Sequence, residues 1–302
     1  MLLAVPAPAS ADDAAPAQPA AAPAKPRLDV NGDGHSDLMY RGLDGVLYVR
    51  TSANIAYPYT IRSTDTSEMP KDIIAPGDLD GSGSPEILTL SASGTLSLFE
   101  SAGEESTGKV RWSGTGWQKY NKVISPGDLN GDGRSDLLAR TPSGDLYEYT
   151  STGKVDSAPF KAGVKVGYGW GSYDQIVGAN DVNGDGIGDV VARTPGGDLY
   201  FYAATGDPAK PLKKRVKAGY GFDIYNQLVA AEDINGDGRG DLMARTQNGD
   251  VYTYRSNGYG GFRYRVADTF GWSKAAQFVG EGGNPDYGKR ELEGRTNAGH
   301  LW

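Results

Sequence analysis

The sequence contains no cysteine, which excludes disulfides, thiolate metal sites and cysteine nucleophiles. It has only two histidines, His35 and His300, which leaves little room for histidine-based catalysis or for a zinc site with several histidines. No apolar run reaches the roughly 18 residues of a membrane-spanning helix, so no membrane span is expected. The net charge of −8 argues against a general nucleic-acid-binding protein, because phosphate recognition requires a basic surface.

Glycine, by contrast, is abundant. The chain has 44 glycines among 302 residues, about twice the usual share. These glycines follow no three-residue period, which excludes a collagen-like triple helix. The composition therefore predicts many turns between short strands, in a chain long enough to bury a large core.

Residues 1–26 differ from the rest of the chain, because 11 of them are alanine and 6 are proline. The apolar start and the sequence Ala9-Ser10-Ala11 indicate the end of a signal peptide with its cleavage site. We therefore expect a secreted protein with a signal-peptide remnant at 1–11 and an Ala/Pro-rich linker at 12–27. A disordered tail on a cytoplasmic protein is the alternative.

A repeat of about 50 residues fills residues 28–302. Five copies contain a nine-residue acidic segment that has aspartate at position 1 and an acidic residue at position 9. The segments begin at Asp29, Asp78, Asp128, Asp181 and Asp233. A sixth copy has lost the segment and keeps only Glu291 at one of its acidic positions.

Each copy has the same order of strand signals. An apolar run such as 175–179 precedes the acidic segment, and another such as 136–141 follows it. A tight turn such as Asn248-Gly249 then leads to an alternating strand such as 251–254, and a more variable strand such as 262–266 completes the copy. This pattern predicts an all-β protein, a β-propeller of about six four-stranded blades, with seven not excluded.

The sequence leaves the closure of the ring open. The first copy lacks the strand that precedes its acidic segment, and the last copy stops at Trp302, inside its third strand. A six-bladed ring, an incomplete ring and a seven-bladed ring with sequence missing are therefore alternatives.

Oxygen-bearing side chains occupy positions 1, 3, 5 and 9 of each acidic segment, and glycine at position 6 permits a sharp turn. Hard oxygen ligands around a flexible loop are typical of Ca²⁺ sites. Flanking strands and the lack of a carboxylate at position 12 distinguish these loops from EF-hands. We therefore predict one Ca²⁺ per loop, about five in total. The predicted ligands are Asp29, Asn31, Asp33, Asp37, Asp78, Asp80, Ser82, Glu86, Asp128, Asn130, Asp132, Asp136, Asp181, Asn183, Asp185, Asp189, Asp233, Asn235, Asp237 and Asp241.

The alternative is that these residues only form turns, but five copies in one register favour metal loops. The second loop is the weakest candidate, because Ser82 replaces a charged ligand, Pro85 stiffens the exit and Glu86 is one methylene longer than aspartate. The five loops hold 15 of the 38 acidic residues, so five Ca²⁺ ions would move the net charge from −8 to +2. The acidity therefore indicates metal sites rather than a cationic partner.

The nine-residue loop within a four-strand unit resembles the FG-GAP repeats of integrin α heads, in their bacterial secreted form. The resemblance covers roughly residues 28–302. It implies a β-propeller in which a Ca²⁺ loop joins the first two strands of each blade, with the ligands given above. The family includes adhesion heads, lectins and non-catalytic modules attached to hydrolases, so the resemblance alone does not identify a ligand.

A recurring aromatic group near the end of each copy is a candidate ligand site. Aromatic faces beside polar groups suit sugars, whose C–H faces are apolar. Packing between blades is the alternative, because a position repeated in every unit is usually architectural. The candidates are Trp117, Trp170, Tyr173, Phe222, Tyr225 and Trp272.

These features predict a secreted, monomeric calcium-binding module for an extracellular glycan or a surface protein. The second hypothesis is a calcium-dependent polysaccharide-cleaving enzyme, either a lyase or a hydrolase. The sequence has no G-x-S-x-G, H-E-x-x-H or P-loop motif, and nearly all of its paired carboxylates lie in the acidic loops. We therefore expect no catalytic site.

Overall fold

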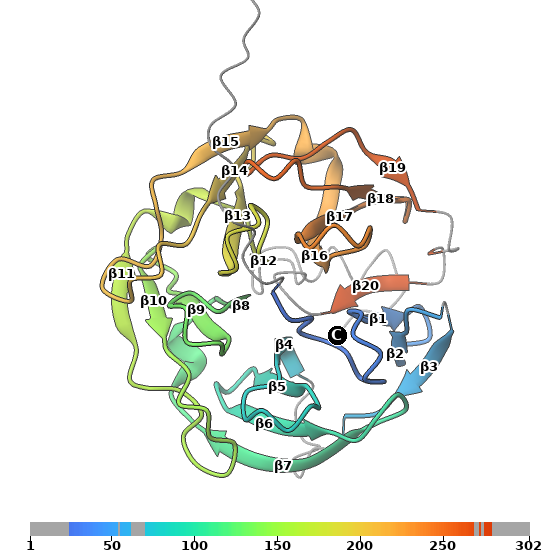
Figure 1. The fold of residues 1–302 in the computed structure, drawn as a ribbon, viewed down its shortest axis with the longest axis vertical. Helices are drawn as coiled ribbons and strands as arrows, with labels where there is room; N and C mark the ends of the chain where they lie inside the picture. Colours follow the sequence, from blue (N-terminus) through green and yellow to red (C-terminus); the bar gives the residue numbers. More distant parts are fainter. Residues whose placement is uncertain (1–23, 54, 62–69, 269–271, 273–274, 280–302) are drawn as a thin grey trace, which may run out of the picture.

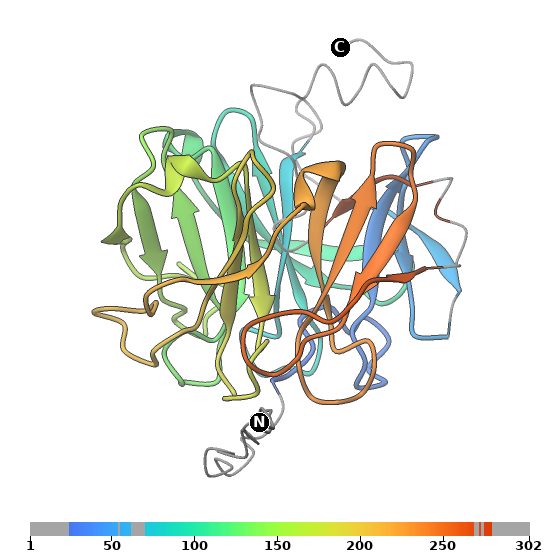
Figure 2. The same cartoon turned by 90° about the horizontal axis from the view of Figure 1, so that it is seen from above.

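The computed structural model describes residues 24–53, 55–61, 70–268, 272 and 275–279. These residues form five four-stranded antiparallel sheets that surround a central axis as the blades of a β-propeller (Figures 1 and 2). In each blade one strand lies next to the axis and three further strands follow outward. No helix among the described residues is long and apolar enough to cross a membrane.

The blades are numbered by their order along the chain. Blade 1 contains β20 (Ala275–Val279), β1 (Leu38–Gly42), β2 (Leu47–Arg50) and β3 (Ala56–Tyr59). Blade 2 contains β4 (Pro70–Gly77), β5 (Glu86–Ser91), β6 (Leu96–Ser101) and β7 (Thr107–Gly114). Blade 3 contains β8 (Lys122–Gly127), β9 (Asp136–Arg140), β10 (Leu146–Tyr149) and β11 (Val164–Gly167). Blade 4 contains β12 (Gln175–Asn180), β13 (Asp189–Arg193), β14 (Leu199–Tyr202) and β15 (Val216–Gly219). Blade 5 contains β16 (Tyr225–Glu232), β17 (Asp241–Thr246), β18 (Val251–Tyr254) and β19 (Val266–Ala267).

The propeller fold confirms the predicted class, but the prediction of six or seven blades is wrong for the described residues, which form five. The reason is the way in which the ring closes. Strand β20 comes from the sixth copy and pairs antiparallel with β1, with Met39 opposite Val279 and Tyr40 opposite Phe278. The sixth copy thus supplies the inner strand that the first copy lacks. Residues 280–302, the remainder of the sixth copy, lie outside the described residues.

The hydrophobic core lies between neighbouring blades. Between blades 3 and 4, for example, Leu138 and Leu146 pack in one cluster with Ala192 and Tyr200. Along β14, Tyr200 packs toward blade 3 and Leu199 toward blade 5, because successive side chains of a strand point to opposite faces. Each blade is therefore buried on both faces by its neighbours.

The segment from residue 24 onward enters the centre of the ring (Figure 1). There, Arg27 is buried, with 2% of its surface exposed. Its guanidinium donates to Glu232 of blade 5 (Nε to Oε1, 2.6 Å), to the carbonyl of Gly178 in blade 4 (3.0 Å) and to the carbonyl of Ser125 in blade 3. One side chain therefore links three blades at the axis.

Candidate metal centres

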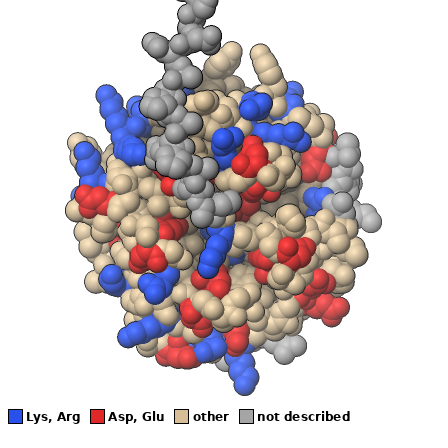
Figure 3. All heavy atoms as spheres, viewed as in Figure 1, with Lys and Arg blue, Asp and Glu red and all other residues tan. Residues whose placement is uncertain are grey.

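The five acidic loops emerge at the same end of the blades. In blades 2–5 each loop joins the first and second strands, and in blade 1 the loop directly precedes β1. Because the strands of an antiparallel meander alternate in direction, the loops occupy one face of the propeller. In the view of Figure 3, acidic side chains lie in separate groups around the ring, with basic side chains between them.

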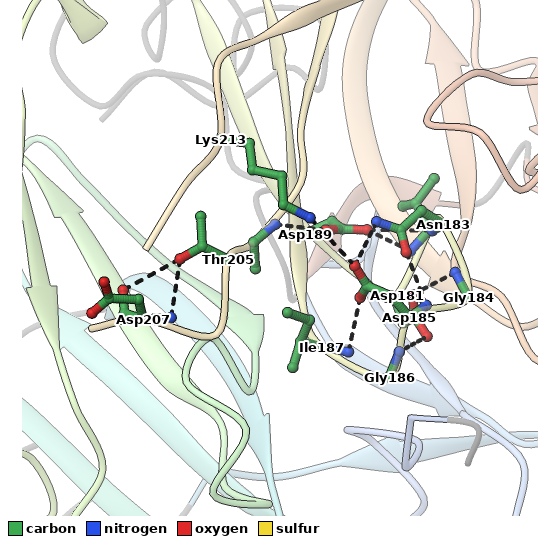
Figure 4. Close-up of polar contacts among 12 residues, drawn as sticks. Asp181, Asn183, Gly184, Asp185, Gly186, Ile187, Asp189, Thr205, Asp207 and Lys213 are labelled. Atoms are coloured by element: carbon green, nitrogen blue, oxygen red, sulfur yellow. Dashed lines mark hydrogen bonds and ion pairs between the residues drawn. The ribbon is translucent and has the colours of Figure 1, made fainter. Parts of the chain in front are cut away.

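The first aspartate of each loop accepts hydrogen bonds from the backbone of its own loop. In blade 4, Asp181 Oδ1 accepts from Gly184 N at 2.7 Å and from Asp185 N at 3.0 Å, and Oδ2 accepts from Gly186 N at 2.7 Å (Figure 4). The first aspartates of the other four loops accept the same three bonds. Each loop is therefore wrapped around one carboxylate.

The carboxylate at position 9 fastens the loop to its blade. In blade 4, Asp189 Oδ2 accepts from Val182 N and Oδ1 accepts from Ala204 N, both at 3.0 Å. The position-9 residues of the other loops accept the same bond from position 2. All five are buried, with at most 6% of their surface exposed.

Burial also changes the acidity of the position-9 carboxyl groups. Loss of solvation is the largest cause, and other carboxylates of the same loop add to it. The pKa of Asp37, Glu86 and Asp136 rises to about 7, and that of Asp241 rises to about 6. The pKa of Asp189 rises well above its usual value for the same reasons. Buried carboxyl groups of this kind favour the uptake of a proton or of a metal cation.

The side chains at positions 3 and 5 accept further hydrogen bonds from the backbone of the loop. In blade 4, Asn183 Oδ1 accepts from Asp185 N at 2.9 Å, and Asp185 Oδ1 accepts from Ile187 N at 3.2 Å. The ammonium of Lys213 lies 3.9 Å from Asp185 Oδ2. In blades 3 and 5 an arginine at position 7 lies 3.8 and 3.7 Å from the position-5 carboxylate. These basic groups offset part of the negative charge of their loops.

The second loop brings three carboxylates together. One oxygen from each of Asp78, Asp80 and Glu86 lies within 4.8 Å of the others. Position 3 is Asp80 here, whereas the other four loops have an asparagine whose amide group donates to a neighbouring carboxylate. At the predicted ligand positions 1, 3, 5 and 9, the five loops offer carboxylate, amide and hydroxyl oxygens and no sulfur or imidazole. This donor set fits a hard cation such as Ca²⁺.

Neighbouring loops also bond to each other, which the sequence analysis did not predict. Gly188 N donates to the carbonyl of Asp128, and Gly240 N donates to the carbonyl of Asp181, both at 2.6 Å. Each bond joins position 8 of one loop to the first aspartate of the loop in the preceding blade. A Cβ atom at Gly188 would lie 2.2 Å from the carbonyl oxygen of Pro126. Glycine at position 8 is thus the sequence signal that could have revealed this contact.

The six aromatic candidates for ligand binding are all buried, with at most 7% of their surface exposed. Trp170, for example, stacks on Tyr202 with the ring centroids 4.6 Å apart. This burial favours the packing alternative over an open sugar platform. The residues concerned are Trp117, Trp170, Tyr173, Phe222, Tyr225 and Trp272.

Two exposed tyrosines that the sequence analysis overlooked lie two residues before buried aromatic residues of this group. Tyr168 is 85% exposed and Tyr220 is 82% exposed. They follow β11 and β15 and precede the short 3₁₀ segments η2 (Trp170–Ser172) and η3 (Phe222–Ile224). The repeated Gly-Tyr-Gly sequence at both places is the signal that marks them.

The closed ring of four-stranded blades and the shared architecture of the acidic loops define a β-propeller built from acidic-loop repeats. A family model described as an FG-GAP-like repeat matches residues 78–139, 128–192 and 181–244. Together the three matches cover more than half of the chain. The chain therefore belongs to the FG-GAP-like repeat family, which confirms the repeat family predicted from the sequence.

No curated protein matches the chain. Among solved structures, Raptor from Chaetomium thermophilum is similar with 9% sequence identity and a TM-score of 0.40, over 84% of this chain and 22% of the Raptor chain. BBS1N, solved in complex with ARL6DN, is similar with 12% identity and a TM-score of 0.36, over 78% of this chain and 70% of its own. The chain thus spans less than a quarter of the Raptor chain.

Proposed function

We propose that this protein is an extracellular, calcium-stabilised β-propeller that acts as a binding module. The observation that carries the proposal is the common hydrogen-bonding pattern of the five acidic loops, each of which has a buried carboxylate at position 9. The FG-GAP-like propeller fold is typical of binding and adhesion modules, which supports binding over catalysis. The extracellular location rests on the sequence Ala9-Ser10-Ala11.

In each loop, the side chains at positions 1, 3, 5 and 9 would hold the ion. Bound Ca²⁺ supplies the positive charge that neutralises the carboxylates of the loop. The first aspartate keeps the loop wrapped through its backbone hydrogen bonds, as Asp181 does in blade 4. Position 9 connects the loop to the blade, as Asp189 does through Ala204. Metal binding would therefore stabilise the whole blade as well as the loop.

Removal of calcium tests this proposal directly. A ligand that binds only the folded state stabilises it by about 2.7 kcal/mol per site at a hundredfold excess over Kd. We therefore expect an excess of chelator to lower the melting temperature clearly, and we expect calorimetric titration of the metal-free protein to detect about five Ca²⁺ sites. An unchanged melting temperature, after elemental analysis has verified metal removal, would refute the calcium assignment.

A matched pair of variants makes the test specific to a loop. Asp185→Asn removes one charge from the loop of blade 4, whereas Asp207→Asn removes the same charge from an exposed turn outside that loop. Only Asp185→Asn should weaken calcium binding and reduce the stabilisation that calcium provides. Equal effects of the two substitutions would point to a general effect of net charge.

A further inference from the structure

Two matching groups of exposed side chains on adjacent blades indicate what the propeller binds. This inference rests on the proposed binding function. The blade-3 set and the blade-4 set each contain an aspartate, a lysine and a tyrosine. The sets are Asp145, Lys165 and Tyr168 in blade 3, and Asp198, Lys217 and Tyr220 in blade 4.

The charged members of each set form an ion pair at the surface. Lys165 Nζ lies 2.8 Å from Asp145 Oδ1, and Lys217 Nζ lies 2.7 Å from Asp198 Oδ1. All four side chains are accessible, between 30% and 51% exposed. The aspartate belongs to the turn between the second and third strands of its blade, and the lysine belongs to the outermost strand. Each pair therefore offers a donor and an acceptor side by side, with no net charge.

The tyrosine of each set is held beside the turn that carries the aspartate. In blade 3, Trp170 N donates to the carbonyl of Gly144 at 2.9 Å, which brings the chain just after Tyr168 against this turn. The same bond recurs in blade 4, at 3.0 Å. There the ion pair with Asp198 is the main cause that raises the pKa of Lys217, and Tyr200 and Tyr220 add smaller contributions.

The fold itself does not require these sets. Blade 2 forms the same four strands with Thr95, Ser113 and Thr115 at the corresponding places, and in blade 5 Ala267 replaces the lysine. A repeated position that serves packing is buried in each blade, as the neighbouring Trp170 and Phe222 are. The aspartate, lysine and tyrosine instead occur together in two adjacent blades, where the lysine and the tyrosine are exposed and the aspartate is half-buried. This distribution favours a role in binding.

We propose that the two sets are subsites for a neutral polysaccharide, with one pyranose ring stacked on Tyr168 and another on Tyr220. The apolar C–H face of a sugar suits an exposed tyrosine ring. The adjacent ammonium and carboxylate can donate to and accept from neighbouring sugar hydroxyls. Equivalent sets on adjacent blades suit a polymer with repeating units, because two weak contacts on one chain reinforce each other.

The subsites lie on the face opposite the acidic loops. The turn between the second and third strands of a meander emerges at the end of the blade opposite the loop between the first and second strands. Sugar binding and calcium binding therefore use separate side chains, and each can be measured without the other.

Calorimetry of the full chain with Ca²⁺ tests the proposal, with cellohexaose, laminarihexaose, chitohexaose and mannohexaose as probes. We expect at least one of these neutral hexasaccharides to bind. Tyr168→Ala and Tyr220→Ala should each weaken that binding about tenfold, and the double variant should abolish it. Tyr168→Trp, which retains an aromatic face, should preserve the binding.

The matched control is Tyr259→Ala, since Tyr259 is 91% exposed but lies outside both sets. This control should bind the sugar like the wild type. The inference is overturned if no probe binds the wild type, or if the double variant binds as well as the control. Calcium titration of the same samples separates the two proposals. Sugar binding without calcium binding overturns the metal assignment, whereas calcium binding without sugar binding overturns this inference alone.

Discussion

At the scale of single residues, Glu148 is the clearest departure from the repeat. It lies in the middle of β10 and is buried, and its Oε1 atom has no hydrogen-bond partner among the described residues. The equivalent positions of the other blades carry Val49, Leu98, Phe201 and Thr253. A buried carboxyl group is costly to ionise, so burial raises the pKa of Glu148 to about 7, and the nearby carboxylates of Asp136 and Asp207 add to this shift.

This shift predicts a dependence of stability on pH. Because the pKa is higher in the folded than in the unfolded state, Glu148 stabilises the fold at low pH and loses that contribution as the pH rises through about 7. Glutamine does not ionise, so Glu148→Gln should abolish this loss of stability at high pH. At pH about 8 the variant should be more stable than the wild type by roughly 1–3 kcal/mol. Urea unfolding at pH about 5 and about 8, in saturating Ca²⁺, measures the effect. Glu105→Gln, at an exposed site, is the control, and an unchanged pH dependence in Glu148→Gln would contradict the argument.

The aromatic residues give a second prediction at this scale. Trp170 is buried between blades 3 and 4, whereas Tyr168, two residues earlier, is exposed. Trp170→Ala should therefore cost roughly 3–5 kcal/mol of unfolding free energy, as for other buried large aromatic residues. Tyr168→Ala should leave stability nearly unchanged. Thermal melts at fixed Ca²⁺ compare the two, and similar small shifts in both variants would reopen the possibility of a ligand pocket at Trp170.

At the scale of the elements, the acidic loops of blades 3, 4 and 5 form a chain of contacts. Backbone bonds from Gly188 and Gly240 connect each loop to the loop of the preceding blade. A side chain at Gly188 would meet the backbone of Pro126 and Gly127 at 2.2–2.9 Å. These glycines therefore permit the loops to approach closely.

Gly188→Ala should accordingly destabilise the protein by roughly 1–3 kcal/mol, because the new methyl group has no space and its neighbours are backbone atoms. The control is Gly196→Ala, since a Cβ atom at Gly196 would meet nothing within 4 Å. We expect this control to be neutral in denaturant unfolding. Equal stability of the two variants would mean that the loops can separate without cost.

Strands and acidic loops were predictable from the sequence because they depend on local patterns. Alternating residues mark β14 and β18, and the acidic segments lie between strands as expected. The continuous outer strand expected at 262–266 is instead limited to Val266–Ala267, and Phe262 forms only an isolated bridge with Ser256. An outer strand has one neighbour within its blade, so its pattern specifies its extent weakly. The contacts between loops and the exposed tyrosine sets depend on how the blades are arranged, which local patterns do not describe.

At the scale of the whole molecule, segments far apart in the sequence complete the ring. Strand β20 pairs with β1 although more than 200 residues separate them. A count of repeats could not distinguish this closure from a sixth blade, because the first and last copies are each incomplete, in different ways. Arg27 then joins blades 3, 4 and 5 at the axis. The chain around Arg27 is thus anchored to the inner strands of these three blades.

The buried ion pair between Arg27 and Glu232 provides the final prediction. Removing one partner of a buried pair leaves an uncompensated charge, so Arg27→Met should cost roughly 3–5 kcal/mol. Combining Arg27→Met with Glu232→Met should cost less than the sum of the single changes, because no charge is then left unpaired. Arg111→Met is the control, since Arg111 pairs with Asp156 at the surface and should contribute at most about 1 kcal/mol. Urea unfolding of the four variants measures both effects. If Arg27→Met proved no more damaging than Arg111→Met, the segment at the axis would be dispensable, and the pairing of β20 with β1 would have to close the ring alone.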